Sequence, residues 1–243
     1  MSGNQSLMIR LIPILFVFFW STGFLGAKYA LPFIEPFYLL FIRFVLTIGV
    51  FLVLCLIFKA KWPSLRLTGH QIVAGLLIHG AYLGGVFAAI KWGMPAGIAA
   101  IIVGVQPILT ALLSWQLMDE KLRPMQWLGL GLGFIGIVTV ILTTRDSGNT
   151  TLSMPALITA CIALVGISAG TLYQKRFGAG VDLLAGSFWQ YFGAAIVMGI
   201  LAWNFETREV IWDTQLFLAL GWLIFGLSVT AVLLLMYMIR EGE

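Results

Sequence analysis

Long runs of apolar residues, interrupted only by short connectors, occupy almost the whole of this 243-residue chain. A bilayer core about 30 Å thick is crossed by roughly 20 helical residues, and lipid offers no hydrogen-bond partner to an irregular backbone. Eight stretches are long and apolar enough, and they are residues 12–31, 36–58, 71–93, 96–118, 125–144, 154–173, 183–203 and 214–239. The sequence therefore predicts an all-α, polytopic membrane helix bundle with the lipid bilayer as its surroundings.

The composition favours a membrane protein over a soluble one. Hydrophobic residues make up 60% of the chain and charged residues 10%, whereas soluble domains carry about 25% charge. The net charge of +4 does not indicate a nucleic-acid partner, because the basic residues lie in the connectors rather than along one face. No connector is long enough to fold as a separate soluble domain.

The distribution of lysine and arginine predicts which way the chain crosses the membrane, because cytoplasmic loops are enriched in both residues. With the N-terminus inside, nine fall on the cytoplasmic side: Arg10, Lys59, Lys61, Arg66, Lys121, Arg123, Lys175, Arg176 and Arg240. Four fall on the opposite side: Lys28, Lys91, Arg145 and Arg208. We therefore expect a multi-pass protein of the plasma (inner) membrane with a cytoplasmic N-terminus.

The chain resembles itself when it is shifted by 147 positions. The shift gives five identities in 24 positions, pairs the first span with the sixth, and makes Gln190 the counterpart of Arg43. Five spans, an odd number, separate the copies, so the copies have opposite orientations, and inverted repeats are typical of secondary transporters. This predicts a first repeat of five helices over residues 1–146 and an incomplete second repeat of three helices over residues 147–243.

Several motifs together resemble one family of carriers. The first span contains the run WSTGFLGAK at residues 20–28, followed by Pro36 and Arg43. The fourth span contains VQP at residues 105–107, and the acidic turn DEKL follows at residues 119–122. This combination resembles the drug/metabolite transporter superfamily, in its EamA branch.

The resemblance implies a fold and a function. The fold is a ten-helix carrier of five plus five helices, which by this comparison lacks its last two helices here. The function is export of small polar metabolites, such as amino acids, by alternating access of the two inverted repeats. A non-transporting membrane scaffold or subunit is the alternative, and self-association into a homo-oligomer stays open.

The residues that enzymes, metals and cofactors require are missing from the spans. Every Asp and Glu lies in a connector or a tail, and the sequence has no H-E-x-x-H or G-x-S-x-G motif. Cys55 and Cys161 both lie in apolar runs and do not resemble a metal or disulfide pair. We expect a small-molecule substrate, and no catalytic residue, metal or cofactor.

Polar side chains inside the spans are the candidate substrate site, because such groups are costly in lipid and mark transport pathways. Arg43 would anchor a carboxylate or phosphate, or else be a structural charge that caps carbonyls or pairs with Glu35. His79 would bind a proton or substrate, or stay neutral and bonded to a neighbouring helix. Pro107 would kink its span, either as a gate or passively. The expected substrate-binding residues are Trp20, Arg43, His79, Tyr82, Gln106, Ser168 and Gln190.

Overall fold

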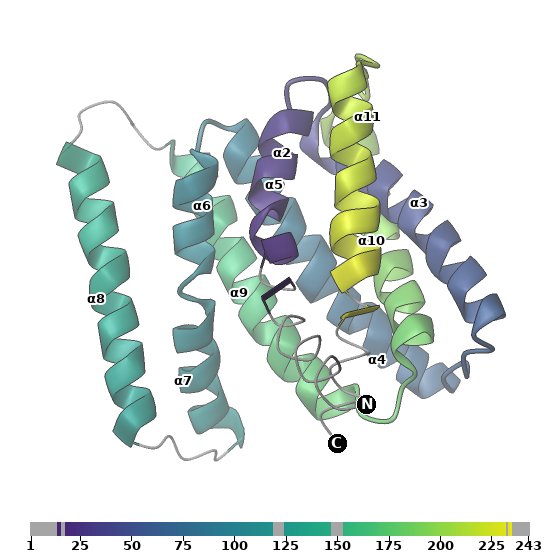
Figure 1. Cartoon of the computed structure of the whole chain (residues 1–243), viewed down its shortest axis with the longest axis horizontal. Coiled ribbons are helices and arrows are strands. Elements are labelled where there is room, and N and C mark those ends of the chain that lie inside the picture. Colours follow the sequence, from purple (N-terminus) through teal and green to yellow (C-terminus); the bar gives the residue numbers. More distant parts are fainter. Residues whose placement is uncertain (1–13, 16–17, 119–123, 147–152, 232, 235–243) are drawn as a thin grey trace, which may run out of the picture.

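Helices make up the described part of the molecule (Figure 1). The computed structural model describes residues 14–15, 18–118, 124–146, 153–231 and 233–234. In chain order the helices are α2 (Gly23–Ala30), α3 (Pro36–Ile57), α4 (Leu65–Gly75), η1 (Leu76–Ala81), α5 (Tyr82–Lys91), α6 (Ala96–Val103), α7 (Gln106–Met118), α8 (Pro124–Asp146), α9 (Met154–Phe177), α10 (Leu183–Phe205), α11 (Thr214–Gly221) and η2 (Trp222–Thr230), where η marks a π-helical segment.

Five helical stretches of the described chain are long and apolar enough to cross a membrane: Pro36–Ile57, Leu65–Lys91, Ala96–Leu117, Met154–Phe177 and Leu183–Phe205. α8, with 23 residues, is as long as these, and a shorter apolar helix covers Thr214–Thr230. Parts of the first and eighth expected spans lie outside the described residues. The prediction of an all-α, polytopic membrane bundle is confirmed.

The third span begins at Leu65, whereas the sequence predicts its start at residue 71. Ser64, with an extended backbone, precedes the helix, and Pro63 lies before it. The first turns contain polar residues, including Arg66 and His70, so hydropathy marks where the helix enters the apolar layer rather than where it begins.

The pair α3 and α10 makes the most extensive contact between helices. α10 also packs on α4, and α5 packs on α9. Glycine allows the close approach of α4 and α10, because a side chain at Gly75 would overlap the backbone carbonyl oxygen of Gln190. α8 lies at one edge of the molecule (Figure 1) and packs mainly on α6 and α7. Its exposed Leu128 and Leu132 suit a surface in contact with lipid.

The two π-helical segments occupy equivalent positions in the two halves of the chain. A shift of 147 residues carries η1 (Leu76–Ala81) onto residues 223–228, which lie inside η2 (Trp222–Thr230). A π-helical segment departs locally from the regular α-helical hydrogen-bond pattern, and such segments are frequent at functional sites. This coincidence does not depend on the sequence identities, and it supports the interpretation of two repeats.

One end of the bundle joins connectors from both halves. The backbone nitrogen of Ile211 donates to the carbonyl of Phe33 at 2.9 Å, beside the isolated antiparallel bridge between Ile34 and Val210. The Lys91 ammonium donates to the carbonyl of Leu31 at 3.0 Å. We call this the outer end, following the predicted orientation.

The opposite end, here the inner end, contains the α3–α4 and α9–α10 connectors. His70 of α4 stacks there on Phe177 of α9, with ring centroids 4.8 Å apart. The basic residues of these connectors and of the adjoining helix ends are Lys59, Lys61, Arg66, Lys175 and Arg176. These are five of the nine basic residues that the sequence assigns to the cytoplasmic side, and they lie at one end of the bundle. Arg10, Lys121, Arg123 and Arg240 lie outside the described residues, and the assignment of this end to the cytoplasm stays a prediction.

Candidate functional site

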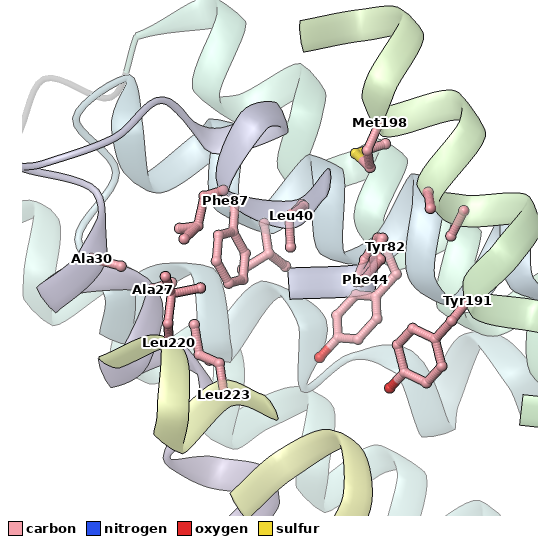
Figure 2. Packing of buried hydrophobic residues seen from close by; sticks show 14 of the residues in the cluster. Ala27, Ala30, Leu40, Phe44, Tyr82, Phe87, Tyr191, Met198, Leu220 and Leu223 are labelled. Atoms are coloured by element: carbon pink, nitrogen blue, oxygen red, sulfur yellow. The ribbon is translucent and has the colours of Figure 1, made fainter. Parts of the chain in front are cut away.

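A small cavity, of about 60 Å³, lies among residues of both halves of the chain. Four of the expected site residues line it: Trp20, Arg43, His79 and Tyr82. Tyr191 of α10 contributes a further wall. Figure 2 shows the hydroxyl groups of Tyr82 and Tyr191 on the same side of the buried cluster.

Arg43 supplies the charge of this cavity, and its side chain is only 2% exposed. Its Nη2 donates to the hydroxyl oxygen of Ser228 at 3.1 Å. Its guanidinium carbon lies 6.0 Å from the centroid of the Phe44 ring. Within the described residues, Nε and Nη1 of Arg43 have no hydrogen-bond partner. The side chain therefore has donor groups left over for an anion.

The alternative partner expected for Arg43 is engaged elsewhere. The Glu35 carboxylate accepts hydrogen bonds from the backbone nitrogens of Thr207 and Arg208, at 2.6 and 3.2 Å, and from the Thr207 hydroxyl at 2.8 Å. Glu35 thus joins two connectors at the outer end and is not the counter-ion of Arg43.

Aromatic side chains form much of the cavity wall. The ring of His79 lies against Tyr191 with centroids 4.1 Å apart and an interplanar angle of 15°. Tyr191 also stacks on Phe51 at 5.7 Å and packs on Phe44 at 5.5 Å. Tyr191 is therefore held between His79 and Phe51. The aromatic side chains that line the cavity favour an aromatic group on a bound molecule.

A second cavity, of about 250 Å³, adjoins the first, and the two share Trp20, Ile78 and His79 in their walls. Asp182, in the α9–α10 connector, is also part of its wall, so this cavity reaches toward the inner end. Gln190 lines the second cavity rather than the first.

Several polar groups of this second cavity are bonded within the protein. The Gln190 side-chain nitrogen donates to the side-chain oxygen of Gln71 at 2.7 Å, and both residues are buried. One carboxylate oxygen of Asp182 accepts from the backbone nitrogens of Leu184 and Ala185 and so caps α10.

The other expected residues lie outside both cavities. Ser168 is fully buried, and its hydroxyl has no hydrogen-bond partner among the described residues. Gln106 begins α7, where its side-chain nitrogen donates to the Thr110 hydroxyl at 3.1 Å. The helix is interrupted between Val103 and Gln106, directly before Pro107. A break at this place fits the missing backbone N–H of proline.

Tyr191 and Gln71 are among the cavity residues that are absent from the sequence-based prediction. A signal for Tyr191 exists, because the shift of 147 positions aligns it with Phe44, and these two counterparts are in ring contact. Gln71 has no such signal, since it falls at the edge of an expected span. The described residues contain no group of three or more side chains suited to a metal ion.

Comparison with known proteins identifies the family. A model described as the EamA-like transporter family matches residues 7–142. The uncharacterized inner membrane transporter YedA of Escherichia coli K12 is 26% identical over 223 residues, which cover 91% of this chain and 71% of YedA. A probable amino-acid metabolite efflux pump of Salmonella typhimurium is 27% identical over 165 residues, which cover 68% of this chain and 52% of the pump.

A protein of known crystal structure has the same fold, with a TM-score of 0.70 and 24% identity over 96% of this chain and 79% of that protein. The described helices include five that are long and apolar enough to cross a membrane. The chain therefore belongs to the EamA-like transporter family of the drug/metabolite transporter superfamily and is a multi-pass membrane transporter.

Proposed function

We propose that this protein exports small polar metabolites that carry an anionic group, such as amino acids, and that Arg43 anchors the anion. The observation that carries the proposal is the buried guanidinium of Arg43, which lines a cavity and has unbonded donors at Nε and Nη1. Two further supports are the membership of a transporter family and the relative named as an amino-acid metabolite efflux pump.

The energetics favour a functional role for this charge. An arginine near the centre of a membrane span costs about 2.5–3.5 kcal/mol on insertion scales. The counterpart of Arg43 in the second repeat is Gln190, a neutral residue, so packing at this position does not require a charge. A guanidinium offers donors in a rigid plane that suits carboxylate and phosphate groups.

The proposed mechanism is alternating access, in which one repeat rocks against the other around a fixed site. The π-helical segments, at equivalent positions of the two repeats, flank the site and supply contacts to it. η1 contributes His79 to the cavity, and η2 contributes Ser228, which accepts the hydrogen bond from Arg43. The two adjoining cavities that share Trp20 and His79 lie along a path from the inner end toward Arg43.

Transport into everted membrane vesicles tests the proposal. Vesicles with the protein should accumulate radiolabelled amino acids or related small carboxylates faster than vesicles without it. Arg43→Gln, which copies the second repeat, should abolish accumulation, and Arg43→Lys should weaken it because lysine lacks the planar fork. Arg66→Gln, which removes an exposed arginine at the inner end, is the matched control.

Two outcomes would contradict the proposal. If Arg43→Gln transports at the normal rate and affinity, Arg43 has a structural role and the anchor is wrong. If no small carboxylate accumulates in any vesicle, the membrane scaffold becomes the better description.

A further inference from the structure

The cavity around Arg43 has positive charge without a carboxylate to balance it. Among the described residues, its wall contains the guanidinium of Arg43 and the ring of His79, and no Asp or Glu. Asp182 lines only the adjoining cavity, where one of its oxygens caps α10. Throughout the sequence, each Asp and Glu lies at a helix end, in a connector or in the C-terminal tail.

A bound carboxylate would therefore find donors, and a bound ammonium group would find no opposite charge. In the described structure only Nη2 of Arg43 is bonded, to the Ser228 hydroxyl. An α-amino acid places its ammonium one carbon from its carboxylate, so the ammonium would enter the cavity close to the guanidinium. Like charges in a buried site repel each other strongly, because few water molecules screen them.

The rest of the cavity suits a flat apolar body. His79 and Tyr191 form a stacked pair at 4.1 Å, and the wall continues over Phe24 and Phe87. Tyr82, only 5% exposed, adds a further ring. Such a surface gains from contact with an aromatic ring. Its rings attract an ammonium group only through the weaker cation–π interaction and give it no opposite charge.

We infer that the Arg43 cavity takes a monocarboxylate with a planar apolar body and no ammonium group, an aryl-alkanoic acid rather than an α-amino acid. This inference rests on the proposed function and narrows its substrate class. The carboxylate bonds to Arg43, and the planar body contacts the aromatic side chains of the cavity wall, which include His79 and Tyr82.

Three compounds with the same phenyl ring separate the contributions of the charges. 3-Phenylpropionate carries the carboxylate alone, phenylalanine adds the ammonium at the neighbouring carbon, and 2-phenylethylamine carries the ammonium alone. Binding of radiolabelled 3-phenylpropionate to the purified protein is measured first. The two other compounds then compete against it at constant pH.

The expected order is 3-phenylpropionate first, phenylalanine weaker by at least about tenfold, and no competition by 2-phenylethylamine. Arg43→Gln should weaken binding of 3-phenylpropionate by at least about tenfold. Arg66→Gln should leave it unchanged. The order of the three compounds on the unaltered protein is a test that needs no variant to fold.

The inference is overturned if phenylalanine binds as tightly as 3-phenylpropionate, if 2-phenylethylamine competes, or if 3-phenylpropionate does not bind. Vesicle transport of amino acids distinguishes this failure from failure of the proposed function. Transport of phenylalanine that depends on Arg43, without a preference for the deaminated acid, would reject the inference and leave the proposed function intact.

Discussion

At the outer end, the carboxylates of Glu35 and Glu206 each accept hydrogen bonds from residues that closely follow the other in the chain. The Glu206 carboxylate accepts from the backbone nitrogens of Phe37 and Tyr38, each at 2.7 Å, in the first turn of α3. The Glu35 carboxylate accepts from Thr207 and Arg208, which directly follow Glu206. The start of α3 is therefore capped by a residue from the end of α10, whereas Asp182 caps the start of α10 from within its own connector. At the outer end, a carboxylate from each proposed repeat therefore accepts hydrogen bonds from the other repeat.

The loss of the Glu206 carboxylate should destabilise the outer end. Glu206→Ala leaves two N–H groups of the α3 first turn without their acceptor, at a cost of about 1 kcal/mol. For a chain of this length, the melting temperature should fall by about 2–4 °C in detergent. The melting temperature of Glu206→Gln, which retains one acceptor oxygen, should fall less. Glu209→Ala, an exposed residue of the same connector, should not change it. Equal melting temperatures for the two alanine variants would refute the cap.

Stability should depend on pH through Glu35. Burial acts to raise its pKa, but hydrogen bonds from Thr207 and Arg208, with the Lys91 charge, hold the pKa of Glu35 below its ordinary 4.5. Its folded form therefore favours the ionised carboxylate. The stability from Glu35 is present above pH 4.5 and is lost as the pH falls further. Glu35→Gln should flatten the fall in melting temperature below that pH. An unchanged acid limb in this variant would contradict the assignment.

The contribution of Glu206 to stability should change with pH in the opposite direction. Burial raises the pKa of Glu206, with a contribution from the charge of Glu35, and the bonds from Phe37 and Tyr38 offset this only in part. The folded protein therefore holds this proton more tightly than the unfolded chain. The contribution of Glu206 to stability falls as the pH rises from 4.5 through its folded pKa. Glu206→Gln should remove that decline. Melting curves of this variant at closely spaced pH values below and above 4.5 would show whether the decline persists.

The close approach of α4 and α10 predicts a sharp effect of one methyl group. Gly75→Ala would push the new side chain against the carbonyl of Gln190 and force the helices apart, at a cost of about 1–3 kcal/mol. It should also lengthen the bond between Gln71 and Gln190. Gly49→Ala is the control, because nothing lies within 4 Å of a side chain at that position of α3. If both variants have the same melting temperature, α4 and α10 can move apart without cost, and their contact at Gly75 is not tight.

The helices could be predicted because lipid imposes a simple rule. An apolar run of sufficient length must be helical where it meets hydrocarbon, and α3, α9 and α10 follow the predicted spans within a few residues. The start of α4 was not predictable by this rule, since its first turns are polar. The π-helical segments η1 and η2 were not expected either. The residues of η1 include leucine, isoleucine and alanine, which are equally suited to an α-helix.

The candidate site could be predicted in part, because a charge inside a span has to face protein or a cavity. This argument led to Arg43, and its cavity also contains Trp20, His79 and Tyr82. The same reasoning also selected Gln106, which does not line the Arg43 cavity. The sequence gives the depth of a residue in the membrane but not the position of its helix in the bundle. α7 contacts α8 and α9 and has no extensive contact with α3, so Gln106 lies away from the Arg43 cavity.

The direction in which the chain crosses the membrane is open to a direct test. Lys61 lies in the α3–α4 connector at the inner end and Arg208 in the α10–α11 connector at the outer end. Because basic residues are concentrated at the Lys61 end, we expect that end to face the cytoplasm. Single cysteines replace Lys61 or Arg208 in a protein in which Cys55→Ala and Cys161→Ala remove the native thiols. An impermeant maleimide added to intact spheroplasts should label position 208 and leave position 61 unlabelled.

Permeabilisation supplies the control for this experiment, since position 61 should become labelled only after the membrane is opened. Protein that retains only Cys161 should stay unlabelled in both conditions. Its thiol lies on α9 among apolar neighbours such as Leu157 and Ile158, within a candidate membrane span that a water-soluble maleimide does not enter. Labelling of position 61 but not of position 208 in intact spheroplasts would reverse the orientation. The outer end joined by Glu35 and Glu206 would then face the cytoplasm, and the second cavity would face the outside.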